Sequence, residues 1–111
     1  AKANGAQVAV VNTYREPGLR RYWVPSIASS AVFGTAIADH WFDVHTGGDL
    51  AFLVGVLRAL VERGGVDEAF VGQHTVGFEE ARTRALAADW ATLERESGST
   101  RERIEAFAQL L

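Results

Sequence analysis

The stretch Gln7-Val8-Ala9-Val10-Val11-Asn12 decides the fold class of this chain. It is a short apolar run rich in β-branched residues, which is typical of a strand buried on both faces of a parallel sheet. A second, weaker strand is predicted over Ala38–Val44, where alternate residues share one face. Together with the helices described next, these strands predict an α/β fold. We expect a partial Rossmann-like parallel-sheet domain that is rich in helix, with two strands and about five helices.

The clearest helix signal follows the second strand. Asp49 is a favourable N-cap, and Leu50–Val61 is apolar nearly all round, with only Arg58 and then Glu62 on a polar side. We predict that this helix is buried on most of its surface and ends at Gly64-Gly65. Four more helices are expected. The first is short, is capped by Asp67 and runs through Phe70 and Val71, and the second runs from Phe78 to Ala88 after Gly77. The third runs from Trp90 to Glu96, and the terminal helix begins with a capping box at Ser99–Glu102.

Residues 13–37 form a long connection between the two predicted strands. Pro17 and Pro25, with several glycines and serines, predict an irregular excursion with a helical turn at Ser30–Phe33. Long structured loops are usually functional. The aromatic residues Tyr22, Trp23 and Phe33 indicate that the excursion packs against other residues instead of being a free linker.

Composition excludes several classes of function. The chain has 111 residues, of which 48% are hydrophobic and 23% charged, as in an ordinary globular domain. A net charge of −3 provides no basic field for a nucleic acid. No apolar run approaches the ~20 residues of a membrane span. Because there is no cysteine, the chain has no thiolate ligand for zinc or an iron–sulfur cluster and no cysteine nucleophile.

Both ends of the chain have the character of internal sequence. Residues 1–4, followed by Gly5, are typical of the last turn of a helix whose earlier turns are missing, and there is no methionine. The terminal helix, with Ile104, Phe107, Ala108 and Leu111 on one face, runs to the last residue without a stop signal. We therefore expect an internal segment of a longer protein.

Neither a metal site nor a catalytic group is predicted within the chain. The carboxylates and histidines at residues 39–45 suggest a metal site, but in an extended strand only Asp43 and His45 lie on one side, and two ligands are a weak signal. Asp39 and Asp43 have no better claim as an acid–base pair, because surface carboxylates are usually solvated.

Two places indicate contact with a ligand. The first is Asn12-Thr13-Tyr14-Arg15-Glu16 at the carboxyl end of the first strand, the edge where parallel sheets bind ligands and a polar residue can bond a ribose hydroxyl. The second is Thr46-Gly47-Gly48-Asp49, where glycines allow close approach to a helix N-terminus and Asp49 can accept two N–H bonds from a guanine edge. A polar turn and a Gly-Gly-Asp cap are the simpler interpretations, and the pattern alone favours them.

Several sequence blocks, in order and with matching spacing over essentially the whole chain, resemble the molybdopterin oxidoreductases. Within that family the chain is most similar to the formate-dehydrogenase-like alpha subunits. The blocks are Val10–Leu19, Tyr22–Ser26, Phe33–Thr35, Ile37–Asp39, His45–Leu53, Val66–Val71 and His74–Glu79. One difference is that many members have Asp-Pro-Arg after the strand, where this chain has Asn12-Thr13-Tyr14-Arg15. The excursion is also longer than in common members.

The resemblance implies a parent enzyme several times longer than this chain. Such enzymes hold molybdenum or tungsten in bis-molybdopterin guanine dinucleotide, and many bind a [4Fe–4S] cluster outside this region. Residues 1–111 would be the central part of the α/β domain that seats one guanosine end of the cofactor. By similarity, the cofactor-binding residues are Asn12, Thr13, Tyr14, Arg15, Glu16, Gly47, Gly48 and Asp49.

The resemblance also sets expectations for the parent and for the segment alone. The parent is expected to be a formate-dehydrogenase-like oxidoreductase of the cytoplasm that works with an electron-transfer subunit. The segment alone is expected to be inactive, to need the remainder of the parent polypeptide and to self-associate through open strand edges. Two alternatives stay open, a stand-alone nucleotide-binding module and a helical interaction domain.

Overall fold

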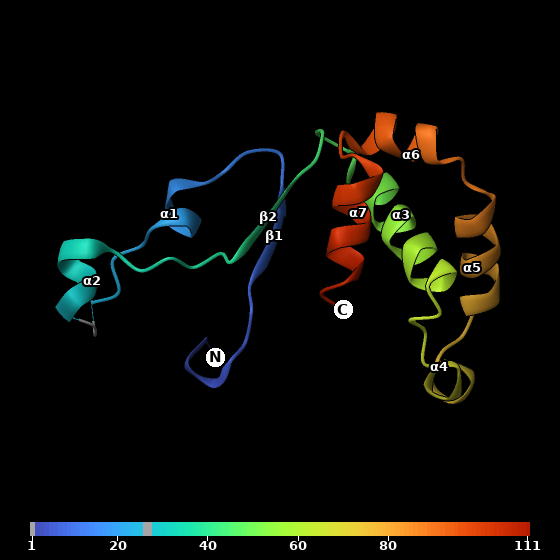
Figure 1. Cartoon of the computed structure of the whole chain (residues 1–111), viewed down its shortest axis with the longest axis horizontal. Coiled ribbons are helices and arrows are strands. Elements are labelled where there is room, and N and C mark those ends of the chain that lie inside the picture. Colours follow the sequence, from blue (N-terminus) through green and yellow to red (C-terminus); the bar gives the residue numbers. More distant parts are fainter. Residues whose placement is uncertain (1, 26–27) are drawn as a thin grey trace. The chain divides into compact units, whose positions relative to one another are not determined.

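The computed structural model describes residues 2–25 and 28–111, so Ser26 of the quoted blocks lies outside the described residues. The predicted fold class is confirmed: the described chain is mixed α/β and rich in helix, with two parallel strands and seven α-helices (Figure 1). The chain divides into two compact units, Ala1–Asp43 and Val44–Leu111. Each unit is described by itself below.

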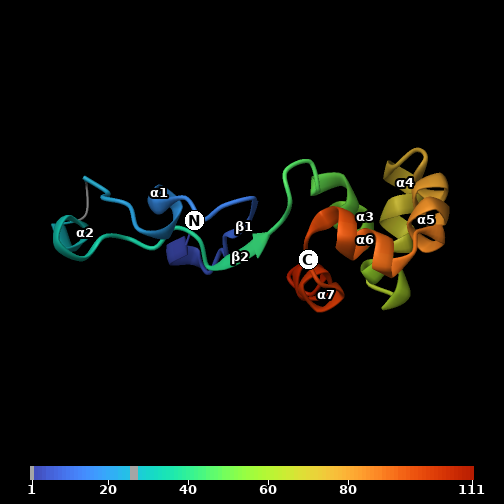
Figure 2. The same cartoon turned by 90° about the horizontal axis from the view of Figure 1, so that it is seen from above.

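The first unit contains the sheet. Strand β1 (Ala9–Asn12) pairs in parallel with β2 (His40–Asp43), in a register that runs from Ala9 opposite His40 to Asn12 opposite Asp43 (Figure 2). The expectation that the first strand is buried on both faces is wrong for the described chain, because Ala9 is exposed and the other residues of β1 are only half-buried. The physical reason is that a strand is buried on both faces only where other elements cover both sides of its sheet, whereas in the described chain β1 makes extensive contact with β2 alone.

An ion pair ties the start of the chain to this sheet. Lys2, in the 3-10 turn η1 (Lys2–Asn4), lies 2.7 Å from a carboxylate oxygen of Asp39, and the other oxygen accepts from the backbone N–H of Val8 at 2.8 Å. The hydrogen bond from Lys2, followed by that from Val8, lowers the pKa of Asp39 below its usual value. This carboxylate therefore joins the segment before β1 to the segment before β2.

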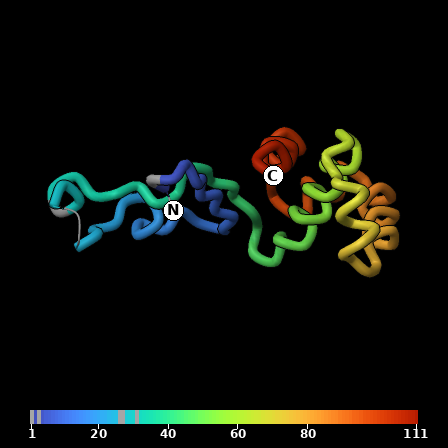
Figure 3. Tube along the Cα trace, turned by 90° about the horizontal axis from the view of Figure 1, so that it is seen from below, coloured from blue at the N-terminus to red at the C-terminus, as the bar shows by residue number. Residues whose placement is uncertain are grey.

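The excursion between the strands is ordered by hydrogen bonds. It contains α1 (Pro17–Arg20) and α2 (Ala28–Phe33), so the predicted helical turn is confirmed and begins earlier than expected. Tyr22 and Thr35 form an antiparallel bridge, and the Cα trace in Figure 3 shows the outgoing and returning arms beside each other. Ser30 is buried, and its hydroxyl accepts from the Val24 N–H at 2.8 Å and donates to the Tyr22 carbonyl at 3.1 Å.

The aromatic side chains of the excursion do not supply this order. Tyr22, Trp23 and Phe33 are 55%, 61% and 71% exposed, so the expectation that they pack against other residues is not met in the described chain. The excursion is nevertheless a defined structure, because Thr35 also donates from its hydroxyl to Ser30 at 2.8 Å.

The second unit is a helical bundle. Helix α3 (Asp49–Glu62) contacts α5 (Phe78–Ala87), α6 (Trp90–Ser97) and α7 (Arg101–Ala108), as Figure 1 shows, and α4 (Glu68–His74) precedes α5. The core is centred on Phe52 and Ile104, each with no exposed surface, and Phe107 meets Phe52 edge to face at a ring distance of 5.4 Å.

Helix α3 differs from its prediction in two respects. Gly48, not Asp49, is the N-cap, because the Gly48 carbonyl accepts from the Phe52 N–H at 3.0 Å and Asp49 is already helical. The helix is also buried on one face instead of most of its surface: Ala51, Phe52, Gly55, Val56 and Ala59 are buried, whereas Leu50 and Leu53 are 75% and 55% exposed. The other helices of the bundle cover only one side of α3, so the apolar side chains on its other side are in contact with solvent.

The predicted polar side of α3 is confirmed, but its arginine is partly buried. Arg58 and Glu62 form the expected i,i+4 pair at 2.7 Å, yet the Arg58 side chain is only 19% exposed. Its guanidinium lies 5.0 Å from the centre of the Trp90 ring, and that of Arg101 lies 4.7 Å from the same ring. Both guanidinium groups therefore pack against the Trp90 ring.

The other helix ends agree with the sequence in most places. Gly64 ends α3 in the left-handed region, with φ +69°, and Asp67 caps α4 by accepting from the Phe70 N–H at 2.9 Å. The capping box predicted at Ser99–Glu102 is wrong: Thr100 is the N-cap of α7 and accepts from the Arg103 N–H, and Ser99 is buried in the turn after α6. Within the described residues, no helix combines the length and apolar character needed to cross a membrane.

Candidate functional site

The first predicted ligand segment begins where β1 ends. Asn12 pairs in the sheet with Asp43, the last residue of β2, so both side chains stand at the carboxyl edge of the strands. The Asn12 amide nitrogen donates to Glu16 at 3.0 Å, and its oxygen accepts from the Thr13 backbone N–H at 2.8 Å. The Asn12 side chain therefore folds the loop back on itself.

Arg15 is held at the same edge by Asp43. A terminal guanidinium nitrogen of Arg15 lies 3.1 Å from one carboxylate oxygen, and its Nε lies 3.5 Å from the other. The hydrogen bond to Asp43 raises the pKa of Arg15 above its usual value. The sequence pattern suggests Asp43 only as a metal ligand or acid–base group. Its position at the end of the second strand, opposite the end of the first, was the signal for this pairing role.

The rest of the first loop is open to solvent. Thr13 and Glu16 are exposed, and the Tyr14 side chain is 59% exposed. The Glu16 carbonyl accepts from the N–H groups of Leu19 and Arg20, which starts α1. The loop thus offers a guanidinium, a carboxylate, two hydroxyls and an amide, groups that bind ribose hydroxyls or phosphates.

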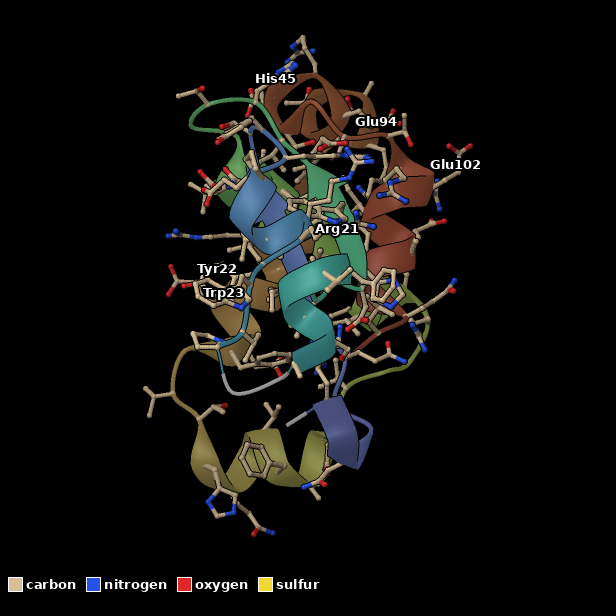
Figure 4. All side chains as sticks on the ribbon, turned by 90° about the vertical axis from the view of Figure 1, so that its left-hand side faces the viewer. Arg21, Tyr22, Trp23, His45, Glu94 and Glu102 are labelled. Carbon is tan, nitrogen blue, oxygen red and sulfur yellow. The ribbon has the colours of Figure 1, made fainter. Side chains whose placement is uncertain are left out.

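The second predicted ligand segment lies before α3 and is fixed to the turn after α6. The His45 N–H donates to the Ser97 carbonyl at 2.7 Å, and the Gly48 N–H donates to the His45 carbonyl at 2.8 Å. Gly48 is buried so closely that a Cβ there would lie 2.7 Å from the Ser97 oxygen and 2.8 Å from the Glu96 oxygen. The turn also needs Gly98, because a Cβ at that position would overlap the His45 ring (His45 is labelled in Figure 4).

Gly47 and Asp49 form the open part of this segment. Gly47 has φ +79°, a left-handed conformation that favours glycine, and among the described residues no atom beyond its two chain neighbours lies within 4 Å of where its Cβ would be. Asp49 is exposed in the first turn of α3. A cavity of about 360 Å³ beside the loop is lined by Gly47, Leu50, Ala51, Val54, Ala88, Asp89, Thr92, Leu93 and Glu96. The carboxylate can accept two N–H bonds from a planar ligand that approaches over Gly47.

The two candidate segments belong to different compact units, and each has an internally fixed backbone. The histidines have separate surroundings: the His40 ring lies 3.0 Å from the Gln7 amide oxygen, and the His74 ring contacts Phe70. Within residues 2–25 and 28–111, no three His, Cys, Asp or Glu side chains are grouped so that they could hold a metal ion.

Comparison with known proteins relates this chain to segments of larger oxidoreductases. No protein-family model matches it. Protein YdeP of Escherichia coli K12 is 33% identical over a region that covers 94% of this chain and 15% of that protein. An uncharacterised oxidoreductase of Mycobacterium tuberculosis H37Rv is 34% identical over 100% of this chain and 15% of that protein. The assimilatory nitrate reductase of Haloferax mediterranei is 37% identical over 68% of this chain and 10% of that protein.

The fold also occurs within a solved structure. The chain aligns with acetylene hydratase from Pelobacter acetylenicus at a TM-score of 0.71 and 20% identity, over 96% of this chain and 12% of that one. The chain thus spans about 15% of the length of the curated relatives that it matches over most of its sequence. The curated relatives support the molybdopterin oxidoreductase family that the sequence blocks indicate, and none of the three named above is a formate dehydrogenase by name.

Proposed function

We propose that this chain is a segment of a molybdopterin oxidoreductase and that it helps to seat one guanosine end of bis-molybdopterin guanine dinucleotide. The observation that carries the proposal is the loop before α3. Its backbone is fixed by His45 and buried Gly48, while Gly47 leaves open space next to the exposed Asp49 carboxylate. A fixed loop with open space and a free acceptor pair fits the N–H edge of guanine.

The first loop, taken by itself, has the chemistry to bind ribose hydroxyls and phosphate. Asn12 and Glu16 offer hydrogen-bond acceptors for ribose hydroxyls, and Arg15, already oriented by Asp43, offers a cation for phosphate. When bound, the cofactor would supply the redox or Lewis-acid chemistry of its metal, whereas the residues of this chain would bind and orient its organic end. A formate-dehydrogenase-like activity of the parent, with an electron-transfer subunit, is part of this proposal.

The decisive experiment replaces Asp49 by Asn in the full-length parent protein. Asn keeps the shape of Asp49 but has one acceptor oxygen instead of two, so it cannot accept both N–H bonds of guanine. We expect guanine and molybdenum content per purified protein to fall about tenfold, since a bidentate contact to a base contributes about 1–3 kcal/mol. The matched control is Glu79→Gln, which also removes an exposed carboxylate from the first turn of a helix that has a glycine N-cap.

Two results would contradict the proposal. One is that Asp49→Asn retains guanine as fully as Glu79→Gln does. The other is that the parent protein contains no pterin. Titration of the isolated chain with GDP and ADP, followed by ¹H–¹⁵N NMR, adds a direct test, because only GDP should shift the resonances around Gly47 and should lose affinity on Asp49→Asn.

We also propose that the isolated segment self-associates. Both strands of the described sheet have an unpaired edge, and such edges favour pairing with another chain. Light scattering across a concentration series should give a mass that rises above that of a 12.0 kDa monomer. A constant monomeric mass would contradict this part of the proposal.

A further inference from the structure

The excursion carries a second candidate site, which is independent of the two loops above. A cavity of about 580 Å³ is lined by Pro17, Arg20, Arg21, Phe33, Gly34 and Ala36. Its volume falls within the range of small-molecule sites. All of these residues belong to the first unit, and the hydrogen bonds of Ser30 hold the arms of the excursion together behind them.

The two arginines of this cavity have no partner in the described residues. Arg15, by contrast, pairs with Asp43, and Arg58 pairs with Glu62. Residues 17–37 contain no acidic residue, so the segment carries two positive charges in a chain whose net charge is −3. Unpaired guanidinium groups that share a cavity attract an anion.

Arg21 is positioned by the backbone opposite it. Gly34 has φ +68°, and a Cβ there would overlap Cγ and Cδ of Arg21. Only glycine therefore allows both this turn and the passage of the Arg21 side chain, which lies beside α2 in Figure 4, with Tyr22 and Trp23 to one side. The exposed Arg21 side chain therefore lies along Gly34 at the cavity that both residues line.

We infer that this cavity binds an organic phosphate with a flat ring. A phosphate monoester carries a charge of about −1.5 to −2 at pH 7, which matches two guanidinium groups better than a single carboxylate does. The 71% exposed Phe33 ring at the cavity offers an aromatic face for the organic part of the ligand. The inference does not rest on the proposed function, since none of these residues belongs to the cofactor loops.

The test uses the whole 111-residue chain and three probes, namely phenyl phosphate, inorganic phosphate and phenol, followed by ¹H–¹⁵N NMR. We expect shifts centred on residues 17–21 and 33–36, with phenyl phosphate bound about threefold to tenfold more tightly than inorganic phosphate because of ring contact. Phenol should not bind. Arg20→Gln and Arg21→Gln should each weaken phenyl phosphate binding about tenfold.

Two further variants separate charge from ring contact. Arg95→Gln is the matched control, an exposed arginine of the second unit whose carboxylate partner is 3.8 Å away, and it should change the affinity less than about twofold. Phe33→Leu should abolish the preference for phenyl phosphate over inorganic phosphate. Because these side chains are exposed, all four variants should keep the far-ultraviolet circular dichroism spectrum of the original chain.

The inference would be overturned if phenyl phosphate bound with equal affinity to Arg20→Gln, Arg21→Gln and Arg95→Gln. Resonance shifts spread evenly over the chain would also overturn it. Binding of inorganic phosphate as tight as that of phenyl phosphate would overturn the assignment of the ring to Phe33. The same titration on the cofactor-loaded parent identifies the source of the phosphate. Retained binding there indicates a free organic phosphate, whereas loss of binding only in the loaded parent indicates a phosphate of the cofactor itself.

Discussion

The close packing of Gly48 leads to a quantitative prediction for Gly48→Ala. The added Cβ would lie 2.7 Å and 2.8 Å from two backbone carbonyl oxygens of α6 and 3.0 Å from the Ser97 Cα. Because these are backbone atoms, no side-chain rotation can relieve the contacts, and overpacking of this kind costs about 1–3 kcal/mol. With φ −80° and ψ −3°, Gly48 has a conformation that alanine adopts readily, which offsets about 0.4–1 kcal/mol through the unfolded state.

The net effect is a loss of about 1–2 kcal/mol in the free energy of unfolding of the second unit. For a unit of this size, each kcal/mol shifts the melting temperature by about 4–8 °C, so Gly48→Ala should lower it by about 4–16 °C. Circular dichroism at the helix band measures this shift. Loss of hydrogen-exchange protection at the His45 N–H, which bonds the Ser97 carbonyl, should accompany it.

Gly72→Ala is the matched control. Gly72 lies inside α4, and apart from its chain neighbours and the helix's own backbone no atom of the described residues lies within 4 Å of where its Cβ would be, so alanine should stabilise the helix by about 0.5–1 kcal/mol. If Gly48→Ala melts at or above the temperature of the original chain while Gly72→Ala behaves as expected, the conclusion that the loop before α3 is fixed against α6 is wrong.

Three further predictions concern other parts of the chain. The hydrogen bond from Lys2 lowers the pKa of Asp39, so the stabilisation of the fold by this carboxylate is present above the usual pKa of 3.8 and is lost as the pH falls through the lowered pKa. Carboxyl NMR should show the lowered pKa, and Asp39→Asn should remove this pH dependence of stability. Ile104→Val should cost about 0.5–1.5 kcal/mol by urea unfolding, since Ile104 is fully buried; no change would contradict its central position. Ser30→Ala should reduce amide protection at Val24, whose N–H donates to the Ser30 hydroxyl, and unchanged exchange there would contradict the role of the hydroxyl.

Sequence patterns anticipated the elements whose signals are local. The apolar run of β1, the αL glycine after α3 and the Asp67 cap depend on neighbours within a few residues, and all three are present. The candidate loops could be selected for the same reason, since a strand end and a glycine pair before a helix are visible in the sequence. Their roles as cofactor contacts stay predictions, to be tested by Asp49→Asn.

Patterns that depend on distant partners were less informative. The aromatic residues of the excursion and the all-round apolar character of α3 both suggested burial, yet Trp23 and Leu50 are largely exposed. Composition reports how apolar a side chain is, but exposure depends on whether another element covers it. Similarly, the N-cap of α7 is Thr100, and Ser99 is buried in the turn after α6.

By itself, the sequence determined the class of fold, the order of its elements and a family resemblance that the relatives support. Only the tertiary structure decided that Arg15 is paired with Asp43, that Gly48 is needed against α6, and that Arg20 and Arg21 share a cavity without a counter-ion among the residues that the structure describes. The physical reason is the range of the interactions. Helix caps and strand patterns arise from backbone geometry over a few residues, whereas ion pairs, close backbone contacts and cavities join residues that only the folded chain brings together.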